Sequence, residues 1–145
     1  MEQVIEQFKE RILVAAANKQ PLRIRGGGTK DWYGQTPVGE LLDTRAYSGV
    51  VAYDPTELVI TVRAGTPLAE VEAILAEQNQ MLAFEPPHFG PGATVGGMVA
   101  SGLSGPGRAA VGATRDFVLG VVLMDGKGES LHFGGQVMKL SLIHI

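Results

Sequence analysis

The strongest constraint on the fold is a glycine-rich stretch at residues 85–116, which carries no formal charge between Glu85 and Arg108. Eight of the 20 glycines in the sequence fall between Gly90 and Gly112. Glycine destabilises the interior of helices and strands, so a run this dense indicates backbone that turns at positive φ or is approached closely by another group. This stretch is therefore expected to form packed loops and short elements rather than long regular structure.

Composition limits the chain to one domain, or to two small subdomains that share a core. Its 145 residues are 45% hydrophobic, which is enough to bury such a core. A net charge of −3 without any Lys/Arg block argues against nucleic acid as a partner. The absence of cysteine excludes disulfides, thiolate metal ligands and a cysteine nucleophile, and it fits a reducing compartment. The three histidines lack metal-ligand spacing, so no metal site is expected.

The amino-terminal residues carry charges through their first turns and lack the basic-then-apolar pattern of a secretory signal. No stretch of about 18 residues is apolar enough to span a bilayer. These two observations predict a cytoplasmic protein without a transmembrane segment.

Hydrophobic periodicity predicts a mixture of helices and strands, with Thr66 as N-cap and Pro67 as first residue of the second helix. The last two strands are joined by the Asp-Gly turn at Asp125, which predicts a β-hairpin. The fold class is therefore α+β. The expected helices cover residues 4–18 and 67–78, and the expected strands cover residues 21–25, 41–43, 49–53, 58–62, 117–124 and 130–133.

A first glycine loop follows the strand at residues 21–25. Successive N–H groups without Cβ obstruction can form a concave nest for an anion, and two cations and a hydroxyl flank them. A phosphate would fit this loop, and a solvent-exposed turn is the alternative. The spacing matches neither the dinucleotide fingerprint nor the P-loop. The loop comprises Arg25, Gly26, Gly27, Gly28, Thr29 and Lys30.

The second glycine loop turns the chain at residues 90–92 and leads into a run of small residues at 98–102. Thr94 is expected to cap a short helix whose free N–H groups face an anion, while Gly96 and Gly97 would let a planar or phosphate-bearing group reach the backbone. The alternative is close packing of backbone on backbone. Two such loops on one short domain suit a dinucleotide, because its pyrophosphate needs several N–H donors.

In this order the motifs resemble the FAD-binding domain of the p-cresol methylhydroxylase and vanillyl-alcohol oxidase superfamily. Within it, they are most similar to the FAD-binding subunits of bacterial glycolate oxidases. The resemblance covers nearly the whole chain and rests on the first glycine loop and on residues 53–68, 81–88, 93–100, 115–120 and 133–139.

The resemblance implies a PCMH-type fold of two α+β subdomains, at residues 1–83 and 84–139, with FAD between them. It implies two-electron oxidation of a 2-hydroxy acid such as glycolate, and a complex with a second flavin subunit and an iron–sulfur subunit, through which the protein could associate with a membrane. The resemblance carries cofactor contact to the six residues of the first loop and to Thr94, Gly96, Gly97, Ser101, Gly102, Gly112 and Asp116.

The sequence departs from the family in two places. Thr29 stands where some members tether the flavin through a histidine, which predicts non-covalent FAD. After Lys139 the family continues through an Asn-x-x-Gly-Tyr-Asp-like segment into a substrate-side cap domain, whereas residues 140–145 read as a foreign or frame-shifted tail or, alternatively, as a natural strand. In either case the cap domain and its catalytic groups are expected to be absent from this chain.

Several other residues keep two interpretations. His88 could act near a flavin or substrate, or be structural. Arg108 could meet a substrate carboxylate or an FAD phosphate, or be solvated. Trp32 and Tyr33 could stack near the cofactor or pack between subdomains. For the whole protein, the alternatives are a D-lactate dehydrogenase-like or other FAD-linked oxidoreductase, and a non-catalytic assembly module that binds FAD or a nucleotide.

Overall fold

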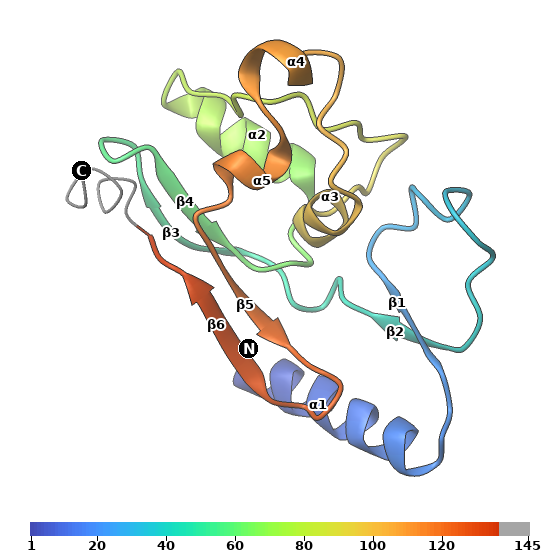
Figure 1. Ribbon diagram of the computed structural model, residues 1–145. Coiled ribbons are helices and arrows are strands. Elements are labelled where there is room, and N and C mark those ends of the chain that lie inside the picture. Colours follow the sequence, from blue (N-terminus) through green and yellow to red (C-terminus); the bar gives the residue numbers. More distant parts are fainter. Residues whose placement is uncertain (137–145) are drawn as a thin grey trace.

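The computed structural model describes residues 1–136 and has the expected α+β class. The sequence interpretations of residues 137–145, including the atypical tail, lie outside the described residues. Figure 1 shows the longest helix, α1, beside the turn of a β-hairpin at one end of the molecule, and the shorter helices and loops at the other. The helices are α1 (Glu2–Ala17), α2 (Leu68–Glu77), α3 (Val95–Ser101), α4 (Arg108–Val111) and α5 (Thr114–Phe117).

The strands of residues 1–136 form three two-stranded sheets. The first pair is parallel, and the other two are antiparallel. The parallel pair places the end of β1 next to the end of β2, with Arg25 opposite Asp43, so that the first glycine loop leaves the sheet at this edge. The strands are β1 (Leu22–Arg25), β2 (Glu40–Asp43), β3 (Val50–Asp54), β4 (Val59–Val62), β5 (Gly120–Met124) and β6 (Ser130–Gly134).

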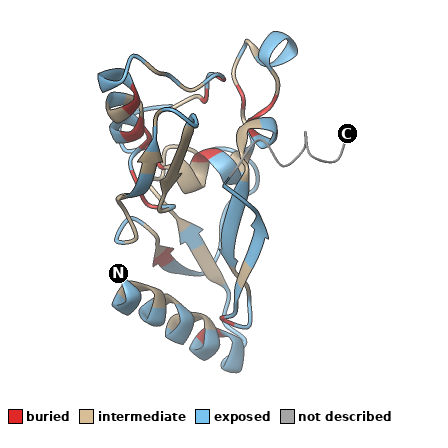
Figure 2. Cartoon of the chain, turned by 90° about the vertical axis from the view of Figure 1, so that its left-hand side faces the viewer, coloured by how far each residue is buried: buried red, intermediate tan, exposed pale blue. Residues whose placement is uncertain are grey.

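A cluster of buried hydrophobic side chains joins the glycine-rich stretch to α2. Leu68 of α2 is fully buried, and Met98 of α3 packs in the same cluster with Phe84 and Ala93. The ring of Phe117 stacks on Phe84 at a centroid distance of 5.2 Å. By contrast, much of α1 and of the β5–β6 hairpin is exposed or half-buried (Figure 2). The core therefore fixes α2, α3 and α5, the elements that surround the second glycine loop.

Two local predictions are wrong. Thr66 does not cap α2, because its buried hydroxyl accepts a hydrogen bond from the N–H of Gly49 and donates one to the carbonyl of Arg63. Pro67 takes the N-cap position, without a side-chain cap. The strand expected from residue 117 begins only at Gly120, since the preceding residues form α5 and turn Phe117 into the core.

Candidate functional site

The first glycine loop presents a row of unpaired backbone donors. Within the described part of the chain, none of the N–H groups of residues 26–30 donates to a protein acceptor, although the carbonyls of Gly28 and Lys30 accept bonds from Asp31 and Tyr33. All five residues are half-buried rather than fully exposed. A row of unpaired N–H groups on a curved backbone is suited to bind phosphate oxygens.

The two cations of this loop differ in their surroundings. Arg25 forms an ion pair with Asp31 at 2.9 Å, and Arg23 approaches the same carboxylate at 3.3 Å. The hydrogen bond from Arg25 and the charges of both arginines hold the pKa of Asp31 below its usual value. Lys30 has no carboxylate partner among residues 1–136, and partial burial lowers its pKa. Lys30 is therefore the cation of this loop that remains available to an anion.

The second loop ends at the start of α3, where Thr94 is the N-cap that the sequence predicts. Its hydroxyl accepts a hydrogen bond from the N–H of Gly97 at 3.2 Å. The N–H of Val95 bonds to the carbonyl of Thr66 at 2.9 Å, and that of Gly96 to the carbonyl of Ala64 at 2.7 Å. The expectation of free N–H groups in the first turn of this helix is therefore wrong, because neighbouring backbone already occupies them.

The two glycine loops lie against each other. A methyl group added to Gly26 would overlap the side chain of Thr94, and one added to Gly27 would overlap the carbonyl of Gly92. Gly96 lies similarly close to Ala64, where an added Cβ would stand 2.9 Å from the carbonyl oxygen. Close backbone packing thus accounts for these three glycines, and it joins both loops into one surface, with the unpaired donors supplied by the first.

The remaining predicted site residues lie beyond α3. Gly102 ends the helix in the left-handed conformation, with φ of 63°, and Ser101 donates its hydroxyl proton to the carbonyl of Met98. The carboxylate of Asp116 accepts a hydrogen bond from the N–H of Ala113 at 2.7 Å, beside Gly112 at φ of 107°. A pocket of about 410 Å³ lies in this region, lined by Val99, Gly102, Arg108, Ala113, Thr114, Arg115 and Val118.

The remaining candidates contact neighbouring elements. His88 places Nε2 3.1 Å from the carboxylate of Glu72 on α2. Trp32 packs edge-on against Phe89, with ring centroids 5.1 Å apart, which favours the packing interpretation of Trp32. Sequence reasoning missed Asp31 and Phe89. The opposite charges of Arg25 and Asp31, six residues apart around a glycine turn, are a signal that could have identified the first.

Two classes of site have no support in the described residues. Over residues 1–136, no group of three His, Asp or Glu side chains could hold a metal ion. In the same part of the chain, no helix is long and apolar enough to cross a membrane.

Comparison with known proteins decides the family. The sequence profile of the FAD binding domain matches residues 3–134. The chain belongs to this family of FAD-binding domains. The unpaired N–H groups of residues 26–30, with Lys30 beside them, fit the pyrophosphate of FAD.

The relatives of this FAD-binding domain are considerably longer than the chain. Glycolate oxidase subunit GlcE of Escherichia coli is 52% identical over 130 residues, which are 90% of this chain and 37% of the relative. A mitochondrial D-lactate dehydrogenase (cytochrome) of Saccharomyces cerevisiae is 27% identical over 83% of this chain and 21% of its own length. The chain thus spans about a third or less of the length of these relatives.

Solved structures agree on the fold. An alkyldihydroxyacetonephosphate synthase superposes with a TM-score of 0.69 at 20% identity, over 95% of this chain and 26% of its own. A glucose dehydrogenase superposes with a TM-score of 0.70 at 20% identity, over 89% of this chain and 27% of its own. The fold is therefore that of the PCMH-type flavoenzymes, of which this chain holds a part.

Proposed function

We propose that this FAD-binding domain serves a flavin-dependent oxidoreductase that oxidises a 2-hydroxy acid, most specifically glycolate to glyoxylate. The observation that carries this proposal is the 52% identity to a glycolate oxidase subunit over 90% of the chain. When bound, FAD supplies a flavin ring that accepts two electrons from the hydroxy acid. The proposed task of this chain is to hold the dinucleotide.

The first glycine loop would hold the pyrophosphate. Its five N–H groups are free to donate, and Lys30 adds positive charge beside them. Arg25 would act mainly through Asp31, because that carboxylate already binds its guanidinium. Thr94, Gly96, Gly97, Ser101, Gly102, Gly112 and Asp116 remain the proposed border of the cofactor site on the second loop and beyond it.

We expect FAD to dissociate from this protein, because Thr29 offers no imidazole for a covalent bond to the flavin. Acid precipitation should leave the yellow chromophore in the supernatant. A chromophore that stays with the precipitated protein would contradict non-covalent binding.

The direct test of the cofactor is a titration of the purified chain with FAD, FMN and ADP, followed by visible absorption and calorimetry. We expect FAD to bind more tightly than FMN, since only FAD carries the pyrophosphate that the first loop would hold. ADP should also bind, through that pyrophosphate. Preference for FMN would contradict the dinucleotide assignment, and binding of none of the three would contradict cofactor binding by this chain.

The proposed partners are a second flavin subunit and an iron–sulfur subunit. The names of two relatives, GlcE of Escherichia coli and GlcD of Bacillus subtilis, each describe a subunit of glycolate oxidase. The proposed location of the complex is the cytoplasm, with membrane association through the partner subunits. Affinity purification from the native cell tests the assembly: recovery of the chain without a flavin or iron–sulfur protein would contradict it.

D-lactate is the second candidate substrate. A D-lactate dehydrogenase of Archaeoglobus fulgidus is 32% identical over 86% of this chain and 29% of its own length. Assays of the native complex with glycolate, D-lactate and longer 2-hydroxy acids separate the two candidates. Because the chain matches 37% of the glycolate oxidase subunit, we expect the 145 residues alone to show no turnover. FAD binding in a complex that oxidises no hydroxy acid would favour an assembly module instead.

A further inference from the structure

The two glycine loops are bridged by aromatic rings on their outer side. Trp32, just after the first loop, meets Phe89, just before the second, edge to face at 5.1 Å. These residues are 57 positions apart in the sequence, and Figure 1 shows the loop between β1 and β2 beside the loop that precedes α3. The contact therefore joins the two halves of the proposed cofactor site.

Each ring is also tied to the first glycine loop. The indole N–H of Trp32 donates to the carbonyl of Thr29 at 3.1 Å, so the ring follows the backbone of that loop. The ammonium group of Lys30 lies 5.9 Å from the centroid of the Phe89 ring, within the range of a cation–π contact. The ring of Phe89 thus contacts both the tryptophan that follows the first loop and the available cation of that loop.

Phe89 holds this place at a conformational cost. Its φ is 53°, in the left-handed region, where a bulky residue is disfavoured by a clash of Cβ with its own backbone. Both residues are also exposed, at 64% for Trp32 and 49% for Phe89, so the contact adds little to the buried core. A role in holding the two loops together would explain why a strained and exposed ring occupies position 89.

We propose that Trp32 and Phe89 form an aromatic bracket that sets the separation of the two glycine loops, and that both are positioning residues for FAD. The bracket acts through the loops, by keeping the N–H groups of residues 26–30 and the side chain of Lys30 directed at the pyrophosphate. This inference rests on the proposed binding of FAD.

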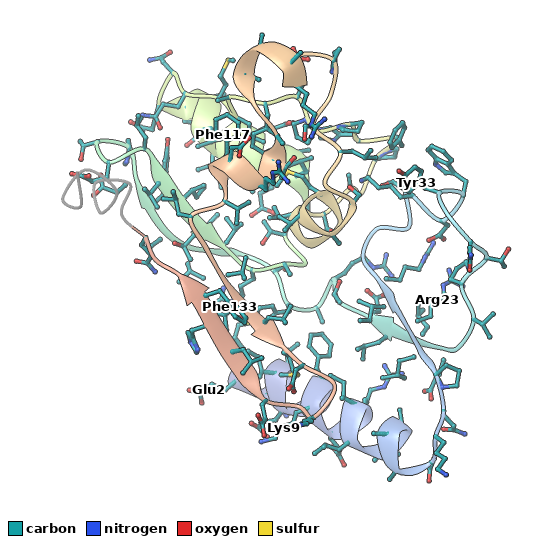
Figure 3. The ribbon with its side chains drawn as sticks, in the orientation of Figure 1. Glu2, Lys9, Arg23, Tyr33, Phe117 and Phe133 are labelled. Carbon is teal, nitrogen blue, oxygen red and sulfur yellow. The ribbon has the colours of Figure 1, made fainter. Side chains whose placement is uncertain are left out.

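Affinity for FAD and for ADP, measured by calorimetry on the 145-residue chain, tests the bracket. Trp32→Leu should lower the affinity for both ligands by about three- to tenfold, the range expected for the loss of one aromatic pair. Trp32→Phe and Phe89→Tyr retain a ring and should recover most of the affinity. Tyr33→Leu is the matched control. Tyr33, labelled in Figure 3, lies in the loop between β1 and β2. Its ring contacts that of Trp32 at a centroid distance of 5.7 Å and no other ring of the described residues. The affinities of this variant should stay within about twofold of the wild type.

Phe89→Gly separates positioning from simple strain. Glycine adopts positive φ without cost, so the substitution removes the strain together with the ring. If Phe89 is only a strained loop residue, FAD affinity will be unchanged or improved. The bracket predicts that affinity falls as in Trp32→Leu, and that combining both substitutions causes little further loss.

Trp32 is also the single tryptophan of the sequence, so its fluorescence reports on the bracket without any ligand. Phe89→Gly should make this emission easier to quench with acrylamide, and unchanged quenching would overturn the bracket. A wild-type chain that binds no FAD would instead overturn the proposed function, and the positioning role with it. FAD binding that is unaffected in every variant would overturn the positioning role alone.

Discussion

At the scale of single residues, Gly27 occupies a position of the first loop where a side chain has no room. Its Cα faces the carbonyl of Gly92, and a methyl group there would overlap that oxygen. Gly27→Ala should therefore push the loops apart and lower the free energy of unfolding by about 1–3 kcal/mol, as overpacking does elsewhere. Urea denaturation measures the change. Gly126→Ala is the control, since nothing lies near that position, and it should stay within about 0.5 kcal/mol. Equal stability of both variants would contradict the close approach.

A second residue-scale prediction concerns acid stability. Hydrogen bonds from Arg45 lower the pKa of Asp43 to about 2, from its usual 3.8. A carboxylate with a lowered pKa stabilises the fold above its unfolded pKa, and this contribution disappears as pH falls toward 2. Because both side chains are at least one-third exposed, the contribution should be below about 1 kcal/mol. Denaturation between pH 7 and pH 2 should show that wild type has a higher free energy of unfolding than Asp43→Asn, and that this difference disappears at acidic pH. A difference that does not depend on pH would contradict the ion pair.

The glycines and charged residues of the two loops also show how much of the candidate site could be predicted from the sequence. The glycine runs indicate where backbone must be approachable, and both loops were predicted for that reason. The partner of each glycine depends on chain folding over long separations, so the contact of Gly27 with Gly92 could not be predicted. The same holds for the pairing of Arg25 with Asp31, which leaves Lys30 as the available cation of the loop.

At the scale of elements, α3 depends on its cap. Thr94 accepts the hydrogen bond of Gly97, and two glycines in the first turns make this seven-residue helix weak by propensity. Thr94→Ala should lower the free energy of unfolding by about 1 kcal/mol, whereas Thr94→Ser retains the acceptor and should be nearly neutral. Thermal denaturation followed by circular dichroism measures both. Equal losses in both variants would show that the methyl group of Thr94, rather than its hydroxyl, stabilises the fold.

Element boundaries were predicted well where the pattern is local. The helix at residues 2–17 and the hairpin around Asp125 follow directly from periodicity and turn chemistry. The apolar run from residue 117 predicts a strand by composition, but Asp116 caps Ala113 and Phe117 turns toward Phe84. Tertiary packing overrides β-propensity there, and a single sequence contains no record of that contact.

At the scale of the whole molecule, FAD should act as a stabiliser because it would bridge loops that are distant in sequence. A ligand that binds only the folded state stabilises it by about 2.7 kcal/mol at one hundred times its dissociation constant. For a chain of this size, that corresponds to a rise in Tm of about 5–10 °C. The rise should grow with the logarithm of FAD concentration and should be smaller with ADP at equal concentration. In Gly27→Ala most of the rise in Tm should be lost, because separated loops cannot both reach one dinucleotide. In Gly126→Ala the rise should be retained. A Tm that does not depend on FAD concentration would contradict binding across the two loops.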